Sequence, residues 1–275
     1  MATPTSTSTP TATASRTPVR ASAPVPAPAP VPALAIESVA KSFGRQPVLE
    51  RVTLTVSAGE FVGLVGLNGA GKTTLIKGLL DFAALDAGTI SIFGVDHRRT
   101  RARERLAFLP ERFNPPYFLT GRDFLAHMAK LHGRGHEEEE VLETVEGLDL
   151  DPAALARPVR SYSKGMAQKL GLAATLLSGR DLYVLDEPMS GLDPRARALF
   201  KRRLLGLREQ GRTVFFSTHL LTDVDDLCDR LAVLHEGRVR FLGTPQECCR
   251  RYEAFSLEQA FLQCIEKGSI EKGSN

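Results

Sequence analysis

The chain contains 275 residues, of which 43% are hydrophobic, and its formal net charge is +3. This length allows one large domain or a core with an inserted subdomain, and the nearly balanced charge gives little support to nucleic-acid binding. Four cysteines without a CxxC pair indicate neither a disulfide framework nor a zinc site, so we expect them to be reduced. No apolar run reaches the roughly 18 residues that span a bilayer, so a function at a membrane requires a second, membrane-spanning chain.

The two ends of the chain differ in composition from the rest. Residues 1–33 consist almost wholly of Thr, Ser, Ala, Pro and Val, so we expect a disordered tail that is partly polyproline II. This tail lacks the apolar segment of a secretory signal. At the other end, the sequence IEKGS occurs at 265–269 and again at 270–274, and we expect residues 268–275 to form a flexible tail.

Between these ends, residues 34–267 read as one domain in which strands and helices alternate. Residues 97–180 have a mostly helical pattern, interrupted by a Pro-rich stretch at 109–121. Strands are expected at 33–40, 52–56, 61–65, 89–94, 181–187, 213–218 and 230–243. Helices are expected after a Gly-rich loop at 66–73 and at 194–210, 220–228 and 256–266.

The order of these elements predicts the fold class. Apolar strands that alternate with helices are typical of a largely parallel sheet. The first two strands, which turn between Gly44 and Pro47, form an antiparallel β region at the edge. We therefore expect an α/β protein with a mainly parallel P-loop core, an antiparallel β edge and a helical subdomain inserted at about 97–180.

The segment GLNGAGKT at residues 66–73 matches the phosphate-binding pattern G-x-x-x-x-G-K-[ST]. It follows an apolar strand and opens an apolar helix, as this loop requires. Gly66, Gly69 and Gly71 let the backbone curl so that its N–H groups face a phosphate. Lys72 supplies a cation to the β- and γ-phosphates, and Thr73 offers a hydroxyl to Mg²⁺. The segment therefore predicts a nucleotide site.

Two adjacent acids end the apolar strand LYVLDE. Asp186 can hold Mg²⁺ directly or through water, and Glu187 can accept a proton from an attacking water molecule. Because two acids at the end of a buried strand are costly without a cation, a role at the metal is favoured over a structural role.

Three other stretches are ambiguous on their own. Residues 189–197 read as a turn and a helix with Asp193 as N-cap. His219 follows an apolar strand; a single histidine is usually structural, but in a P-loop protein one at this place can reach the γ-phosphate. SYSKGMAQKL at 161–170 opens an apolar helix and is either an ordinary capped start or a phosphate site at a helix N-terminus.

Together these residues resemble the ATP-binding-cassette (ABC) family over roughly residues 34–265. The family's motifs occur in order: Walker A at 66–74, the signature at 162–166, Walker B at 182–187, the D-loop at 190–193 and the switch histidine at His219. Phe43 stands where the family has an aromatic residue that stacks on adenine. The complete set in this order is far more specific than any one motif.

The resemblance implies a composite site in a head-to-tail dimer, with ATP between Walker A of one subunit and the signature of the other. Glu187 is implied as general base for in-line attack by water, with His219 near the γ-phosphate. The implied ATP-binding residues are Phe43, Gly66, Leu67, Asn68, Gly69, Ala70, Gly71, Lys72, Thr73, Thr74, Ser163 and Gly165. The implied Mg²⁺ ligands are Thr73, Asp186 and Glu111.

Three positions depart from the usual motifs of the family. The signature has Lys164 for the first Gly and Met166 for the Gln, and Glu111 stands where most members have a Gln. Ser163 and Gly165 still offer a hydroxyl and an unhindered backbone N–H, whereas Lys164 either adds a cation or points to solvent. These variants resemble the ATPase subunits of ABC-2 type exporters.

The resemblance implies an energy-coupling ATPase that drives a separate integral membrane permease, in the direction of export. It also implies a second ATPase subunit, identical or homologous, and a position at the cytoplasmic face of a bacterial inner membrane. The aromatic, Pro-rich residues 110–118 lie where the family docks a helix of the membrane subunit; an ordinary connection between subdomains is the alternative.

Two other functions are weighed against this one. A soluble ABC ATPase acting on nucleic acid or the ribosome is disfavoured because the chain has one cassette and no long coiled coil, and no nucleic-acid partner is expected. A nucleotide-gated module without turnover is disfavoured by the presence of Glu187.

Overall fold

The computed structural model describes residues 1–2 and 30–270, with side chains described up to residue 266. The expected disordered tail at 1–33 and the expected flexible tail at 268–275 fall mostly outside these residues. The chain divides into two units, Met1–Pro30 and Val31–Asn275, and the architecture below belongs to the second unit.

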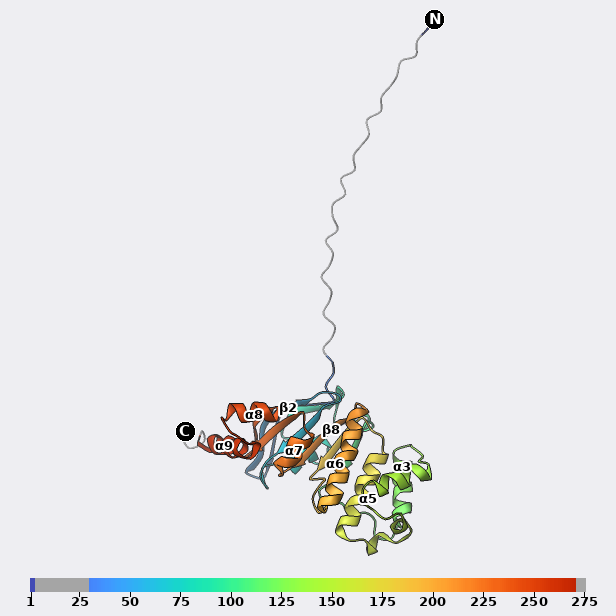
Figure 1. The fold of residues 1–275 in the computed structure, drawn as a ribbon. Coiled ribbons are helices and arrows are strands. Elements are labelled where there is room, and N and C mark those ends of the chain that lie inside the picture. Colours follow the sequence, from blue (N-terminus) through green and yellow to red (C-terminus); the bar gives the residue numbers. More distant parts are fainter. Residues whose placement is uncertain (3–29, 271–275) are drawn as a thin grey trace. The chain divides into compact units, whose positions relative to one another are not determined.

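A six-stranded sheet in the order β10-β9-β3-β8-β7-β6 forms the centre of this unit (Figure 1). Five of its strands run parallel, and β10 pairs antiparallel with β9. The strands are β3 (Phe61–Val65), β6 (Leu106–Leu109), β7 (Leu182–Asp186), β8 (Thr213–Thr218), β9 (Arg230–His235) and β10 (Arg238–Gly243). The mainly parallel P-loop core is therefore confirmed.

A second, antiparallel sheet has the order β2-β1-β4-β5. Its strands are β1 (Leu34–Phe43), β2 (Gln46–Val56), β4 (Ala87–Ile92) and β5 (Val95–Asp96). Strand β2 begins six residues before the expected start at residue 52, because its first half pairs with β1 as far as Phe43 opposite Gln46. This pairing places Phe43 at the tip of a hairpin.

One group of helices lies beside the six-stranded sheet (Figure 1). The group consists of α3 (Gly121–Leu131), α4 (Glu138–Glu146), the 3₁₀ turns η1 (Pro152–Ala156) and η2 (Val159–Ser161), and α5 (Lys164–Leu177). The remaining helices are α1 (Lys72–Leu79), α2 (Thr100–Arg103), α6 (Pro194–Glu209), α7 (Leu221–Leu227), α8 (Pro245–Arg251) and α9 (Leu257–Ile270). None of the helices in the described part of the chain is long and apolar enough to cross a membrane.

Two expectations about these elements are wrong. The region expected to be helical from residue 97 contains β6, because its apolar residues LAFL pair in parallel with β7 inside the sheet. The last helix continues to Ile270 rather than ending at residue 266. At the start of this helix, Gln259 N–H donates to Ser256 Oγ, and the Gln259 side chain accepts from Phe255 N–H.

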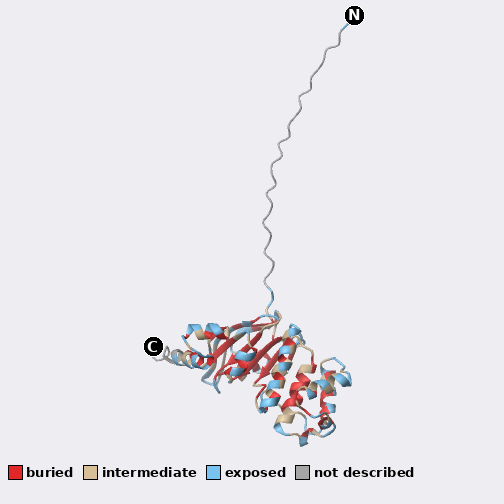
Figure 2. Cartoon of the chain, viewed as in Figure 1, coloured by how far each residue is buried: buried red, intermediate tan, exposed pale blue. Residues whose placement is uncertain are grey.

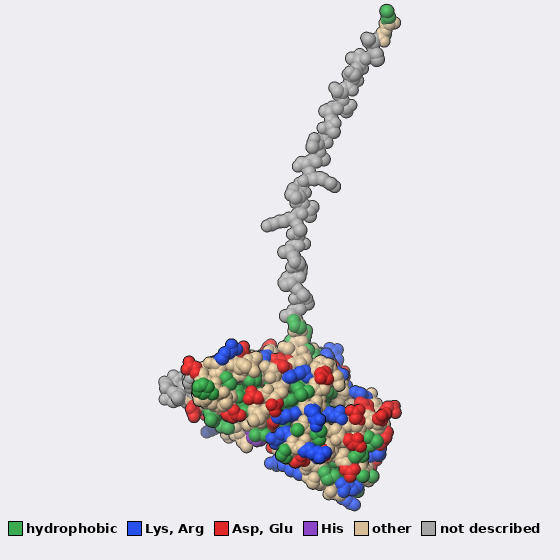
Figure 3. Space-filling model, viewed as in Figure 1, with side chains coloured by type: hydrophobic (Ala, Val, Ile, Leu, Met, Phe, Trp, Pro, Cys, Tyr) green, Lys and Arg blue, Asp and Glu red, His purple; other side chains and the backbone are tan. Residues whose placement is uncertain are grey.

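The buried residues form three hydrophobic clusters around the six-stranded sheet (Figure 2). One joins β7 and β8 to α3, α5 and α6, the second fills the space around α1 between the two sheets, and the third lies under α7, α8 and α9. On the face shown in Figure 3, Lys and Arg side chains gather over α6, whose opposite face is buried in the first cluster. Because hydrophobic clusters pack against both faces of the six-stranded sheet, the positions of the carboxyl ends of its central strands are fixed.

Candidate functional site

Three adjacent parallel strands end at the same edge of the sheet, and each continues into a predicted site segment. Strand β3 leads into the loop at 66–71, β7 ends at Asp186, and β8 ends at Thr218. The register pairs Val65 with Thr218 and Asp186 with Ser217. This edge of a parallel sheet is the usual place for a ligand.

Two glycines of the loop, Gly66 and Gly71, are required for different physical reasons. Gly71 has φ +107°, and a Cβ there would lie 2.9 Å from Val48 O, so the position requires glycine. Gly66 has no positive φ; instead, a Cβ there would collide with the carbonyl oxygen of Leu234 on the neighbouring strand. Close approach of the backbone, rather than chain curl, therefore explains Gly66.

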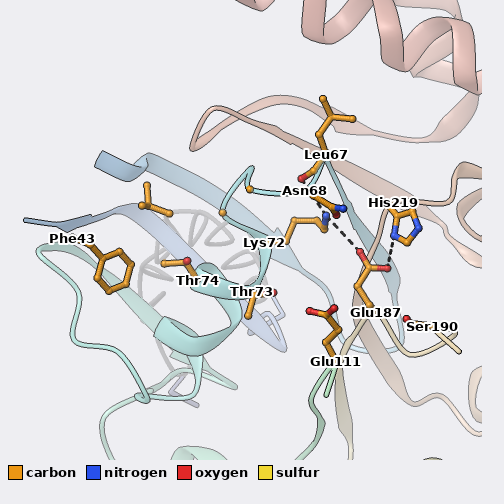
Figure 4. Close-up of a pocket in the computed structure, with 13 residues that line it drawn as sticks. Phe43, Leu67, Asn68, Lys72, Thr73, Thr74, Glu111, Glu187, Ser190 and His219 are labelled. Carbon is orange, nitrogen blue, oxygen red and sulfur yellow. Dashed lines mark hydrogen bonds and ion pairs between the residues drawn. The ribbon is translucent and has the colours of Figure 1, made fainter. Parts of the chain in front are cut away.

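A pocket of about 530 Å³ lies at this edge and contains most of the predicted nucleotide site (Figure 4). The predicted residues that line it are Phe43, Leu67, Asn68, Gly69, Gly71, Lys72, Thr73, Thr74, Glu111, Glu187 and His219, and Val48 and Ser190 line it as well. Phe43 lies at one end and His219 at the other. A long pocket with an exposed aromatic ring at one end and ionic groups at the other suits a nucleotide.

Lys72 and Glu187 form the ionic centre of the pocket. Lys72 Nζ donates to Gly66 O at 2.7 Å and lies 3.5 Å from Glu187 Oε1. Both side chains are nearly buried, with 7% and 11% exposure. The other oxygen of Glu187 lies 2.9 Å from Nδ1 of His219, so that this nitrogen carries a proton when it donates to the carboxylate. Glu187 is therefore held between two donors, as Figure 4 shows.

The backbone of Glu187 is in the left-handed region, with φ 47°. For a residue other than glycine, such a conformation costs about 1–3 kcal/mol and persists only where its surroundings fix it. Ser217 supplies that constraint: its Oγ accepts from Glu187 N–H at 2.9 Å and donates to Asp186 Oδ1 at 2.5 Å. One buried hydroxyl thus orients both acids.

Ser217 was not singled out from the sequence, although a signal for it exists. It is a buried polar residue that directly follows the apolar residues VFF of the strand TVFFST. Its partner became evident only with the register between β7 and β8, which no local pattern reveals. The sequence predicts Ser190 only as part of the turn after Walker B, and the structure shows that it also lines the pocket.

Some predicted residues lie outside the pocket. Asp186 is buried behind it, with its carboxylate bound to Ser217, and Gly66 and Ala70 do not line it. Ser163 and Gly165 also lie elsewhere: Ser163 lines a second pocket of about 740 Å³ together with Lys164 and Glu111. One chain therefore does not bring its own signature into its own nucleotide pocket.

At the start of α5, Ser163 is a helix N-cap, and its Oγ accepts from Met166 N–H at 3.2 Å. The Lys164 side chain is exposed, and its Cε lies against Gly191 of the D-loop, 3.5 Å from where a Cβ of that glycine would stand. Of the two interpretations of this stretch, a capped helix start or a phosphate site, the structure shows the cap. The phosphate site stays a prediction.

The oxygen donors near the pocket fit Mg²⁺ but do not form a complete cage. Within the described ranges, no group of three or more His, Cys, Asp or Glu side chains is arranged to hold a metal ion. Thr73 and Glu111 line the pocket, and Asp186 lies next to it. Mg²⁺ is usually held by one or two carboxylates together with substrate phosphates, and this arrangement matches that pattern.

A family model for ABC transporters matches residues 49–190 of this chain. The chain belongs to the ABC transporter family. A similar relative is an uncharacterized ABC transporter ATP-binding protein, YdbJ, from Bacillus subtilis, with 37% identity over 75% of this chain and 68% of that protein. Nod factor export ATP-binding protein I from Burkholderia lata is 40% identical over 76% of this chain and 69% of that protein.

Solved structures of ABC ATPases share the fold. The structure described as an ATP-binding subunit of an ABC transporter has a TM-score of 0.76 and 32% identity, and covers 84% of this chain and 98% of its own. A dimeric ATP-binding cassette bound to ADP and Pi has a TM-score of 0.70 at 21% identity, covering 77% of this chain and 98% of its own, and shows the fold alone. The predicted family and fold class are confirmed.

The relatives also bear on the alternative functions. An uncharacterized ABC transporter ATP-binding protein from Synechocystis is 36% identical over 76% of this chain, but the matched region is only 60% of that relative. None of the relatives and neighbours named here is described as acting on nucleic acid or the ribosome. The nucleic-acid alternative gains no support.

Proposed function

We propose that this ABC protein is an ATPase subunit that hydrolyses ATP in a head-to-tail dimer and drives a separate membrane permease. The observation that carries the proposal is the division of the site. Lys72, Glu187 and His219 meet in one pocket, whereas Ser163 of the same chain lies outside it. A second chain supplies the missing half.

Within the pocket, each group has a role that follows from its place. Phe43 stacks on the base, because its ring is more than half exposed at the end of the pocket farthest from the ionic centre. Lys72 binds the β- and γ-phosphates, exchanging its 3.5 Å contact with Glu187 for a phosphate oxygen. Glu187, once released from Lys72, is free to accept a proton from the attacking water.

His219 and the metal complete this half of the site. His219, which donates to Glu187 from the end of β8, orients that carboxylate and offers its ring to the γ-phosphate. Thr73 and Asp186, with Glu111 nearby, would hold Mg²⁺, which neutralises charge that develops on the phosphates. Ser217 keeps the Asp186 carboxylate turned in one direction for this purpose.

The second pocket is the proposed docking place for the permease. Glu111 lines both this pocket and the nucleotide pocket, so its carboxylate lies between them. Tyr117 and Phe118 are both about 70% exposed, with their rings edge to face at 5.6 Å. Exposed aromatic side chains at the rim of a groove are typical of protein interfaces, and a helix of a permease is the proposed occupant.

The names of similar proteins support a proposed direction of transport. Export is proposed because similar proteins are named Nod factor export ATP-binding proteins and because the YSKGM signature resembles that of ABC-2 exporters. The protein would then act at the cytoplasmic face of a bacterial inner membrane.

The test combines dilution with one substitution. Wild-type ATP turnover per chain is measured at protein concentrations from well above to well below the dimer dissociation range, and we expect it to fall steeply on dilution. Glu187→Gln, which keeps the size of the side chain but cannot accept the proton, should bind ATP, dimerise and hydrolyse at least about 100-fold more slowly. Constant turnover per chain on dilution, or full turnover by Glu187→Gln, would refute the proposal.

A further inference from the structure

The first two turns of α5 lie against the loop that follows Glu187. A Cβ on Gly165 would be 3.4 Å from Gly191 O, and the Lys164 stem lies over the same glycine. Further along the helix, Gln168 and Lys169 are buried, with 5% and 8% exposure. Positions 164, 165, 168 and 169 share one face of the helix, and this face contacts the loop at residues 188–193.

Gln168 makes the contact nearest to the acid. Its Nε2 donates to Pro188 O at 3.1 Å, in a buried environment. Pro188 directly follows Glu187, whose own backbone conformation is strained. A buried carbonyl needs a donor, and the donor here belongs to the signature helix. The backbone next to Glu187 is therefore fixed on one side by Ser217 of β8 and on the other by Gln168 of α5.

Lys169 fixes the far end of the same loop. Its Nζ donates to Asp149 O at 2.8 Å and Asp149 Oδ2 at 3.0 Å, and lies 3.7 Å from Asp193 Oδ2. Asp193 is the N-cap of α6, with its Oδ1 accepting from Ala196 N–H at 2.9 Å. The charge of Lys169 is thus compensated by acidic groups of its own chain. Lys169 therefore has a role in fixing the loop and not in binding a phosphate.

The loop held in this way reaches the nucleotide pocket. Ser190 lies between the two anchored ends and lines the pocket beside Glu187. In the proposed dimer, the N-terminus of α5 contacts the nucleotide bound by the partner chain. The side chains of the same helix contact the loop that lines the nucleotide pocket of its own chain.

We propose that Gln168 and Lys169 are positioning residues, which transmit the seating of α5 on one nucleotide to Glu187 and Ser190 at the other. The inference rests on the proposed function, because it needs the head-to-tail dimer. Seating of α5 shifts Pro188 through Gln168 and Asp193 through Lys169, and so sets the final position of Glu187. Displacements of about 1 Å in a catalytic group can cost roughly 100-fold in rate, so small movements of this loop suffice.

The test uses four substitutions on α5. Gln168→Met and Lys169→Met remove the polar groups but keep the side-chain stems, and Lys169→Arg keeps the cation. Thr175→Val is the matched control, because Thr175 is also buried on α5 but its hydroxyl donates to Gly171 O within the same helix. For each variant we measure thermal stability, affinity of the monomer for a fluorescent ATP analogue at low protein concentration, and kcat and Hill coefficient for ATP at high concentration. ATP-dependent dimerisation is followed by sedimentation in the Glu187→Gln background.

A positioning role predicts a split among these measurements. Gln168→Met and Lys169→Met should lose roughly tenfold or more in kcat and lower the Hill coefficient towards 1. Their monomer affinity should stay within about twofold, because neither residue lines the nucleotide pocket. Dimerisation should persist, because both side chains are buried and bond within their own chain. Lys169→Arg should recover most of the kcat, and Thr175→Val should resemble the wild type.

Two results would overturn the inference, and they differ from failure of the proposed function. If the wild type dimerises and hydrolyses but the two Met variants keep its kcat and Hill coefficient, the inference is wrong. It is also wrong if monomer affinity falls in proportion to kcat, since that indicates general damage to the fold. If the wild type shows no concentration-dependent hydrolysis, the proposed function fails and the inference falls with it.

Discussion

Two helix N-termini in this chain were expected to meet phosphate, and they are built differently. Helix α1 has Gly71 as N-cap, and no side chain caps it, so its first N–H groups remain as donors for a ligand. Helix α5 has Ser163 as N-cap, whose hydroxyl already accepts from Met166 N–H. The first is incomplete without an anion, whereas the second is a stable capped helix in a single chain.

The surrounding charges show the same difference. At α1, the buried Lys72 has two backbone carbonyls and one carboxylate at 3.5 Å, so an anion can take the place of that carboxylate. At α5, the buried Lys169 is already bound by two groups of Asp149. The start of α1 therefore offers a phosphate free N–H groups and a lysine within one chain. The start of α5 is expected to bind phosphate only in the dimer. Loss of α1 function should show in the monomer, and loss of α5 function only in the dimer.

The largest effect on ATP affinity is expected for Lys72→Ala. The substitution removes the buried cation and leaves Glu187 without one of its two donors, so monomer affinity for ATP should fall at least roughly 30-fold. Equilibrium titration with a fluorescent ATP analogue measures it. Lys77→Ala is the control, because it removes an exposed lysine from the same helix and should leave affinity unchanged. Equal affinities of Lys72→Ala and wild type would contradict the comparison.

A smaller and more selective effect is expected at Ser163. Asp and Asn both cap helices as well as Ser, but only Asp places a negative charge where the partner's γ-phosphate should lie. Ser163→Asp should therefore keep its thermal stability and monomer ATP affinity while losing most ATP-dependent dimerisation and turnover. Ser163→Asn should retain more of both.

The comparison of the two variants separates a helix cap from a phosphate site. Dimerisation is followed by sedimentation with ATP and Mg²⁺, and turnover by phosphate release. If Ser163→Asp dimerises and hydrolyses like Ser163→Asn, the residue is a cap and nothing more, and the second half of the composite site lies elsewhere.

Local sequence was sufficient for the half of the site that is continuous in the chain. The loop at 66–74 contains its own glycines, lysine and hydroxyls, so its pattern predicts this part of the pocket without information about the neighbouring strands. Walker B and His219 lie close together because each comes at the end of an apolar strand of a parallel sheet, and the ends of such strands meet.

The contacts missed from sequence depend on register. Ser217 faces Asp186 because β7 and β8 pair in one register, and Gln168 reaches Pro188 twenty residues away because α5 packs on the sheet. Strand β6 was missed for the same reason: four apolar residues between Arg105 and Pro110 become a strand only through pairing with β7. Hydrophobic period alone cannot distinguish so short a strand from a helix.

The smallest expected effect is a pH dependence at Asp193. The N–H of Ala196 donates to this N-cap carboxylate and lowers the pKa of Asp193, with a further contribution from Lys169. A carboxyl whose pKa is lowered by folding stabilises the protein above its unfolded pKa of about 3.9, and this stabilisation is lost as the pH falls through the folded pKa. The wild type should therefore exceed Asp193→Asn in free energy of unfolding at pH 5–7, and the difference should shrink below about pH 4.

Urea unfolding of both chains at pH 7, 5, 4 and 3 measures this difference. In the Lys169→Met background the pH-dependent part should be smaller, because one of the charges that lowers the pKa has been removed. This result would show that the charge of Lys169 on α5 lowers the pKa of Asp193 within one chain. A difference that grows as the pH falls would contradict the assigned sign, since it would mean that folding raises the pKa of Asp193.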